Sequence, residues 1–220
     1  MVPFDIKRNI QTVLSNIERA AAGVEITVVG ATKTVPPEVI NVALENGITA
    51  VGENRVQEYL AKRDAVKPAD WHFIGTLQTN KAKYLVGSVA LIQSVNSRGL
   101  ADEISRLAIK RGVVQDVLLE VNAAGESSKT GANLDEVQAL AEYVQGLKGV
   151  RVRGLMSMPP KGADDEVYRK LRDLYETLAR GKTDFDVLSV GMSVDYERAI
   201  HFGSNMVRIG SALFGARQYE

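Results

Sequence analysis

The sequence predicts an α/β protein built as a closed (β/α)₈ barrel, a TIM barrel, with one extra helix at the N-terminus. Eight short apolar runs are each followed by a segment with helical periodicity, which is typical of a parallel sheet covered by helices. The length of 220 residues lies within the range of one such barrel. Because no linker-like or repeated segment interrupts the chain, we expect a single domain over residues 1–220.

The composition excludes several classes of function. Lysine plus arginine and aspartate plus glutamate number 27 each, so we expect no nucleic-acid partner and no membrane association. Cysteine is absent, which excludes disulfides, thiol nucleophiles and thiolate metal sites. Only two histidines are present, and we expect no metal site. The N-terminal segment has no apolar stretch of signal-peptide length, so we expect a cytoplasmic protein.

The chain opens with an amphipathic helix and then alternates between strands and helices. Ile6, Ile10, Val13 and Ile17 recur at helical spacing, so this first helix packs one apolar face on the body of the protein. The predicted strands cover residues 28–33, 48–52, 72–75, 89–95, 113–121, 150–156, 187–190 and 206–209. The helices that follow them cover 37–46, 56–65, a segment through 86, 97–111, a segment ending near 146, 164–180, 196–202 and the residues from 212.

Local signals support these element boundaries. The pair Pro36-Pro37 can open a helix but cannot continue a strand, and Gly47 suits the position just after a helix end. Two of the longer helices each carry one apolar stripe. The stripes are formed by Leu100, Ile104, Leu107 and Ala108, and by Val167, Leu171, Leu174 and Leu178.

One lysine follows a buried strand, where barrels of this kind bind ligands. Lys33 comes after the β-branched residues Val28 and Val29, so we expect it at the carboxyl end of the first strand. Desolvation of a lysine favours the neutral amine, which is the form that attacks carbonyl carbons. Lys33 is therefore a candidate for a Schiff base. The alternative is a strand-end lysine whose charged group reaches water.

Two later strand ends carry small residues with free backbone amides. The turn Gly191-Met192-Ser193 follows the seventh predicted strand, and Gly210-Ser211 follows the eighth. Loops after these two strands often bind phosphate in such barrels, because amides at the start of a helix attract anions. We therefore expect a phosphate site here, although either Gly-Ser pair alone would suit an ordinary helix cap.

Arg208 interrupts the last apolar strand, Met206-Val207-Arg208-Ile209. A buried unpaired charge is costly, so Arg208 either pairs with a carboxylate across the barrel or donates hydrogen bonds to a ligand. Such a ligand would lie between Lys33 and the phosphate site. An amine, a phosphate site and a polar group for a ring nitrogen are the three contacts that pyridoxal 5′-phosphate (PLP) requires.

Seven segments in matching order resemble the pyridoxal phosphate homeostasis proteins, single-domain relatives of the alanine racemase barrel. They are residues 31–34, 51–58, 72–81, 128–131, 154–158, 188–195 and 207–215, and they span nearly the whole chain. The resemblance implies a PLP fold-type III barrel. Asn205, Ser211 and Val190 depart from the residues common in the family, but serine at 211 keeps the hydroxyl of the usual threonine.

The resemblance also implies roles for individual residues. Lys33 would form the internal aldimine with PLP, Arg208 would face the pyridine nitrogen, and Asn54 would lie near the ring. The phosphate would be held by Ser193, Gly210 and Ser211. An arginine opposite the ring nitrogen disfavours its protonation, which weakens the ring as an electron sink.

Five other polar residues receive a structural interpretation. Asp195 is a carboxylate near the predicted phosphate site, but its place before a helix suits an N-cap. Lys81 and Lys129 are near the predicted rim, where solvation is a simpler role than cofactor transfer. His72 begins a strand, and His201 ends a helix, where a cation is favourable.

Racemisation requires a base on each face of the cofactor, and Lys33 supplies only one. In the racemases that this chain resembles, the other base is a tyrosine from an additional domain. The sequence shows no such domain, and Tyr196 is its nearest tyrosine to the rim. We therefore expect no catalytic residue, and a monomeric PLP-binding protein that serves vitamin B6 and amino-acid homeostasis and supplies recipient apo-enzymes. The alternatives are a weak PLP-dependent racemase or decarboxylase and a cofactor-free Schiff-base aldolase.

Overall fold

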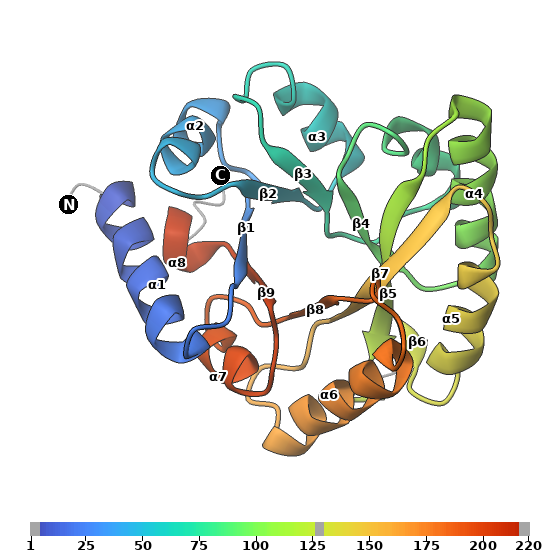
Figure 1. Ribbon diagram of the computed structural model, residues 1–220. Helices are drawn as coiled ribbons and strands as arrows, with labels where there is room; N and C mark the ends of the chain where they lie inside the picture. The colour runs from blue at the N-terminus through green and yellow to red at the C-terminus, as the bar shows by residue number, and fades with distance from the viewer. Residues whose placement is uncertain (1–4, 126–129, 216–220) are drawn as a thin grey trace.

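The structure is a computed structural model that describes residues 5–125 and 130–215. Its centre is a closed barrel of eight parallel strands, which Figure 1 shows nearly along the barrel axis. The strands are β1 (Thr27–Ala31), β2 (Ala50–Glu53), β3 (Asp70–Phe73), β4 (Leu91–Val95), β5 (Gln115–Asn122), β7 (Val150–Ser157), β8 (Val187–Val190) and β9 (Met206–Ile209). The pairing of β1 with β9 and of β4 with β5 closes the ring. The predicted (β/α)₈ barrel is confirmed.

Helices surround this ring on the outside (Figure 1). The segments after the strands are α2 (Pro37–Glu45), α3 (Val56–Lys62), the 3₁₀ helix η1 (Thr79–Tyr84), α4 (Arg98–Arg111), α5 (Val137–Gln145), α6 (Asp165–Ala179), α7 (Tyr196–His201) and α8 (Ser211–Phe214). The predicted extra helix is α1 (Ile6–Ala21), which lies outside the barrel beside α7 and α8.

Capping residues explain where several helices begin and end. Asp5 accepts a hydrogen bond from the Arg8 amide at the start of α1, over 3.1 Å. The side chain of Ser97 caps α4, which ends at Gly112 with φ 66°. Gly47 follows α2 with φ 100°, a conformation that other residues rarely adopt. The chain can therefore turn sharply from each helix towards its next strand.

Several predicted elements have ends shifted by two or three residues, as in β1, which ends at Ala31 and not at residue 33, and two further elements differ in kind. The segment predicted as a helix through residue 86 is the short 3₁₀ helix η1, which has the tighter turns typical of short connections. The loop before α5 contains a two-residue strand, β6 (Ala132–Asn133), which pairs with the end of β5 outside the ring. Part of the 128–131 motif lies outside the described residues, and so does Lys129. Strands β8 and β9 have the predicted bounds.

The core has two layers, one inside the barrel and one between the barrel and its helices. The inner layer consists of Val29, Ala50, Leu91, Leu118, Met156, Val187 and Met206, one side chain from nearly every strand. Ile10, Val13 and Ile17 of α1 are buried against the first and last strand-helix units. Each such side chain contributes roughly 1.5–3 kcal/mol by leaving water. The inner layer fills the barrel below its carboxyl end, so a ligand site at that end lies above this layer.

None of the helices in the described ranges is both long enough and apolar enough to span a bilayer.

Candidate functional site

Lys33 lies at the carboxyl end of the barrel, as predicted, but in the turn two residues after β1 ends at Ala31 and not in the strand itself. The hydroxyl of Thr32 donates to Oε1 of Glu53 over 2.7 Å, so the residue before Lys33 is held by a buried hydrogen bond. The side chain of Lys33 is half-buried. Its Nζ forms no hydrogen bond or ion pair with any residue that the structure describes. A half-buried amine without a partner is free to react.

A second lysine holds the backbone on either side of Lys33. Nζ of Lys62 donates to the carbonyl of Thr32 over 2.8 Å, to Glu53 over 2.7 Å and to Glu58 over 3.0 Å. Glu58 also accepts a hydrogen bond from the backbone amide of Thr34 over 2.8 Å. Thr34 has φ 65°, a strained conformation for a β-branched residue, which these contacts maintain. Lys62 is therefore structural, in contrast to Lys33.

Burial changes the acidity of Glu53 in this group. Its side chain is fully buried, and desolvation raises its pKa although hydrogen bonds from Lys62 and Thr32 oppose the shift.

Arg208 lies inside the barrel on β9 and is 3% exposed. Its Nη1 donates to the carbonyl and the hydroxyl of Ser189 over 2.8 and 2.6 Å, and its Nη2 donates to the carbonyl of Ser157 over 2.8 Å. No described carboxylate lies within ion-pair distance, so the buried ion pair left open by the sequence is not found. Burial lowers the pKa of Arg208 to about 10, which still leaves the guanidinium charged at neutral pH.

The two turns predicted to bind phosphate lie against one another. The hydroxyl of Ser193, after β8, accepts hydrogen bonds from the backbone amides of Gly210 and Ala212, over 3.1 and 3.2 Å. A Cβ placed on Gly210 would lie 3.5 Å from the carbonyl oxygen of Ala31, the last residue of β1. The turns are therefore adjacent to the strand that ends two residues before Lys33. A cavity of about 900 Å³ beside Ser193 opens towards α1.

Asn54 lies at the same height as Lys33 on the neighbouring strand. Ala31 is paired with Gly52, and each of the two polar residues follows two positions later. Asn54 is half-buried. Gly75 packs on its backbone, because a Cβ on Gly75 would lie only 2.2 Å from the carbonyl oxygen of Asn54. The structure thus brings all six predicted site residues to one end of the barrel, in turns or strands that are neighbours.

Asp195 does not cap a helix in the way the sequence suggested. It occupies the N-cap position of α7, but its carboxylate makes no hydrogen bond to the first turn. Instead Oδ1 accepts from the Met192 amide over 2.7 Å, and Oδ2 accepts from the hydroxyl of Tyr168 over 2.6 Å. The negative charge raises the pKa of Tyr168 further, in addition to the effect of burial. Asp195 therefore fixes the turn that carries Ser193.

Three buried polar residues near Arg208 were not found from the sequence. Ser189 and Gln93 are fully buried, and Glu120 on β5 is 2% exposed. Glu120 accepts a hydrogen bond from Thr130 over 2.6 Å, and burial raises its pKa although Arg208 opposes the shift. The available signal was a polar residue inside an apolar strand of a parallel sheet, as in Val117-Leu118-Leu119-Glu120-Val121.

Comparison with known proteins agrees with this geometry. The family model described as "Alanine racemase, N-terminal domain" matches residues 5–218. A curated relative from Aquifex aeolicus named "Pyridoxal phosphate homeostasis protein" is 46% identical and covers 97% of both chains. This chain belongs to the family of pyridoxal phosphate homeostasis proteins, which the racemase domain model also matches. A relative from Pasteurella multocida with the same name is 36% identical over 98% of this chain and 96% of its own.

Solved structures share the fold of this family member. PipY from Synechococcus elongatus with PLP bound has a TM-score of 0.84 and 27% identity, covering 96% of this chain and 100% of that chain. An alanine racemase from Clostridium difficile has a TM-score of 0.75 at 17% identity. The match covers 97% of this chain but only 57% of that racemase, so the barrel corresponds to one part of the longer enzyme.

Proposed function

We propose that this chain binds PLP at the carboxyl end of the barrel, with Lys33 as its covalent attachment point, and acts in PLP homeostasis without catalysing a reaction of its own. One observation carries the proposal: a half-buried amine without a partner lies at the same end of the barrel as two adjoining turns rich in amides. The names of the curated relatives and the PLP bound to PipY support it.

The side chains fit the cofactor chemically. The backbone amide of Ser211 and the hydroxyls of Ser193 and Ser211 suit a phosphate, whereas the amide of Gly210 is bonded to Ser193 and holds the two turns together. Arg208 contacts only neutral oxygen atoms, so a neutral ring nitrogen can join them as a further acceptor. Asn54 would lie beside the ring. When bound, PLP supplies an aldehyde that condenses with amines and a ring that withdraws electrons.

Arg208 favours binding over turnover. A guanidinium only donates hydrogen bonds, so it holds the ring nitrogen in the unprotonated form. An unprotonated ring withdraws electrons weakly, which slows reactions that place negative charge on the bound substrate. Asp195 and Glu120 stabilise the charge of Arg208 from a distance, but no described carboxylate is hydrogen-bonded to its guanidinium.

Lys33 does not line the cavity beside Ser193, and the described tyrosines that do line it are hydrogen-bonded. The hydroxyl of Tyr196 accepts from Asn16 over 3.1 Å, and the hydroxyl of Tyr168 donates to Asp195 over 2.6 Å. Racemisation needs a second base that is free to exchange a proton with the substrate. This supports a binding protein over the alternative, a weak PLP-dependent racemase or decarboxylase.

The proposal extends to the state and location of the protein. Few large apolar side chains in the described ranges are strongly exposed, and we infer a monomer from their small number. They are Val24, Tyr84, Ile109, Val114 and Val194. We further infer that the protein works in the cytoplasm, where it would supply PLP to recipient apo-enzymes.

Borohydride reduction tests the attachment point. Purified protein titrated with PLP is expected to turn yellow, and reduction followed by peptide mass mapping is expected to locate the cofactor on Lys33. Lys33→Ala should abolish this attachment, whereas Lys83→Ala, which changes an exposed lysine, should leave it unchanged. A label on another lysine would contradict the proposal.

An amino-acid assay with the cofactor-loaded protein separates the alternatives. Robust stereospecific turnover that Lys33→Ala abolishes would favour the racemase or decarboxylase. A colourless protein that cleaves a phosphosugar through Lys33 would favour the aldolase.

A further inference from the structure

A chain of buried hydrogen bonds leads away from Arg208 through the inside of the barrel. Nη1 of Arg208 donates to the hydroxyl of Ser189 over 2.6 Å, and that hydroxyl donates to Oε1 of Gln93 over 2.7 Å. Nε2 of Gln93 lies 2.9 Å from Nδ1 of His72. The four side chains come from β9, β8, β4 and β3, so the chain crosses the barrel. Each of them is at most 6% exposed.

The direction of every bond in this chain follows from Arg208. A guanidinium has no acceptor, so the hydroxyl of Ser189 must accept from it, and its only hydrogen is left for Gln93. Oε1 of Gln93 therefore faces the hydroxyl of Ser189. Its Nε2 faces Nδ1 of His72 and lies 3.3 Å from the sulfur of Met206. With the amide reversed, Oε1 would face that sulfur without a hydrogen between them.

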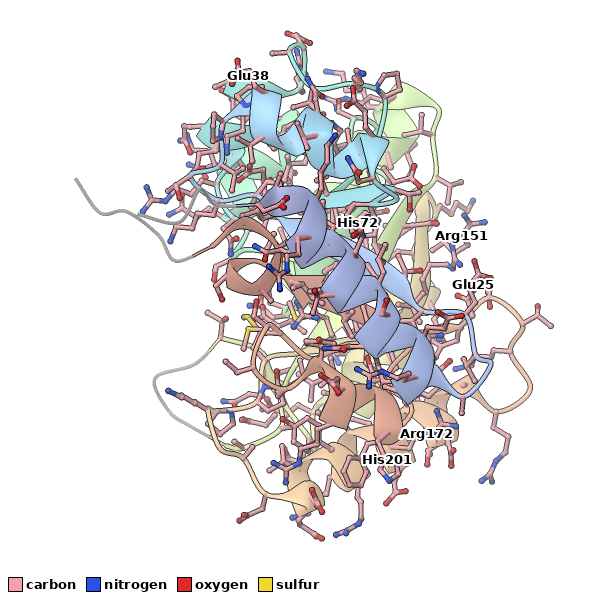
Figure 2. The ribbon with its side chains drawn as sticks, turned by 90° about the vertical axis from the view of Figure 1, so that its left-hand side faces the viewer. Glu25, Glu38, His72, Arg151, Arg172 and His201 are labelled. Atoms are coloured by element: carbon pink, nitrogen blue, oxygen red, sulfur yellow. The ribbon has the colours of Figure 1, made fainter. Side chains whose placement is uncertain are left out.

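The same logic fixes the proton of His72. Nδ1 accepts from Gln93, so the proton of the neutral ring is on Nε2. His72 lines a cavity of about 450 Å³ at the amino ends of the strands, where Asp70, Asp116 and Asp186 also lie. Glu25 also lines this cavity, and Figure 2 labels it on the right-hand side of the molecule. Nε2 has no described partner and directs its hydrogen to the cavity.

Only neutral groups contact the charge of Arg208, which gives the chain a physical role. Successive hydrogen bonds polarise each other, so a directed chain of donors spreads part of the positive charge away from the guanidinium. The chain also restricts the rotation of the Arg208 side chain, because Ser189 holds Nη1 through both its carbonyl and its hydroxyl.

We propose that Ser189, Gln93 and His72 are positioning residues that orient Arg208 and tune its interaction with the ring nitrogen of PLP. The proposal rests on the proposed function for the contact between Arg208 and the cofactor. The direction of the hydrogen bonds from Arg208 to His72 is a property of the protein without PLP. The two parts can therefore be tested separately.

The first experiment uses the protein without cofactor. Nitrogen NMR of the His72 ring is expected to show a neutral imidazole with the proton on Nε2. A proton on Nδ1 would overturn the chain, because Gln93 could then no longer donate to that atom.

The second experiment measures PLP affinity and the absorption band of the bound cofactor. Gln93→Met keeps the size of the side chain but breaks the chain, and we expect about tenfold weaker binding and a shifted band. The matched control is Gln115→Met, since Gln115 is also buried, on β5, and its side chain bonds among the described residues to the backbone of Gly87, Val89 and Asp116. The control is expected to keep both the affinity and the band.

A second variant provides an independent measurement if Gln93→Met fails to fold. Ser189→Ala removes the hydroxyl and leaves the carbonyl contact to Arg208, so its band is expected to shift in the same direction as that of Gln93→Met. Bands unchanged in both variants, or changed equally in Gln115→Met, would overturn the proposal. Failure of the unmodified protein to bind PLP would instead refute the proposed function, and the His72 tautomer would still decide the direction of the chain.

Discussion

At the scale of single residues, the barrel treats its two central cations in opposite ways. Arg208 is enclosed, and several of its N–H groups are bonded to oxygen atoms of the barrel wall. Lys33 is half-buried and its amine has no described partner. A fixed donor suits recognition of an acceptor, whereas an unbonded amine suits a covalent bond that must form and break. The two residues thus differ in role because the strands leave them different polar surroundings.

A pH titration of stability tests the burial of His72. Burial lowers its pKa from 6.5 to about 4, so the folded state binds fewer protons than the unfolded state between these values. Stability from this group is therefore present above pH 6.5 and is lost as the pH falls to about 4, by about 3 kcal/mol. The unfolding free energy of His72→Gln should not show this decrease between pH 6.5 and about pH 4.

Urea unfolding, followed by the fluorescence of Trp71, measures the unfolding free energy of the unmodified protein and of His72→Gln at each pH. Glu53 and Glu120 titrate with the opposite sign because their pKa values are raised, but they are common to both proteins. The difference between the two unfolding free energies should narrow on acidification. Parallel curves would show that His72 is not buried as a neutral ring.

The sequence predicted which strand ends would carry Lys33 and Arg208 but not the contacts of these residues. Lys33 and Arg208 could be placed because each lies in or after an apolar strand, and strand ends meet on one side of a parallel barrel. The contacts of Arg208 come from Ser157 and Ser189, on β7 and β8. Their identity depends on the stagger of neighbouring strands, which one-dimensional periodicity does not encode. Gln93 and Glu120 were not predicted for the same reason, because the stagger of their strands cannot be read from the sequence.

At the scale of elements, two serines in the last strand-helix units make different contacts. Ser193 lies in the turn after β8, half-buried, and bridges to the amides of Gly210 and Ala212. Ser204 lies before β9, is 2% exposed, and its hydroxyl is within hydrogen-bond distance of the backbone of Val190 and Met206. One serine therefore joins the two turns that we propose bind phosphate, and the other joins two strands.

These two serines form a matched pair of variants. Ser193→Ala is expected to weaken PLP binding about tenfold, because one hydroxyl contact to the phosphate is lost, with little change in stability. Ser204→Ala is expected to lower the unfolding free energy by about 1 kcal/mol and to leave PLP affinity unchanged. Fluorescence titration and urea unfolding measure the two quantities. Equal effects of both variants on affinity would remove Ser193 from the phosphate site.

Element order was predictable because β-branched runs and helix caps are local signals, as at Pro37 and Ser97. The 3₁₀ helix η1 and the strand β6 were not predictable in the same way. Both are short, so their conformation is decided by packing on neighbouring strands and not by their own periodicity.

At the scale of the whole molecule, closure makes the strands depend on one another. Each of the eight strands is bonded to two neighbours, and the outer layer of the core is shared between consecutive helices. The helix α1 adds a link between distant parts of the sequence, since it packs on Ala43 of α2, Ile200 of α7 and Leu213 of α8. Loss of any one unit would expose the sides of both neighbours. We therefore propose that the chain is a single domain.

Calorimetry tests this proposal together with cofactor binding. The protein is expected to unfold in one transition whose calorimetric and van't Hoff enthalpies agree, because no strand can leave the ring alone. PLP at about one hundred times its dissociation constant should stabilise the folded state by about 2.7 kcal/mol and raise the midpoint accordingly. Lys33→Ala should keep the single transition and lose most of that rise. Two separate transitions without cofactor would contradict the single domain, and a rise unchanged in Lys33→Ala would contradict covalent attachment at that residue.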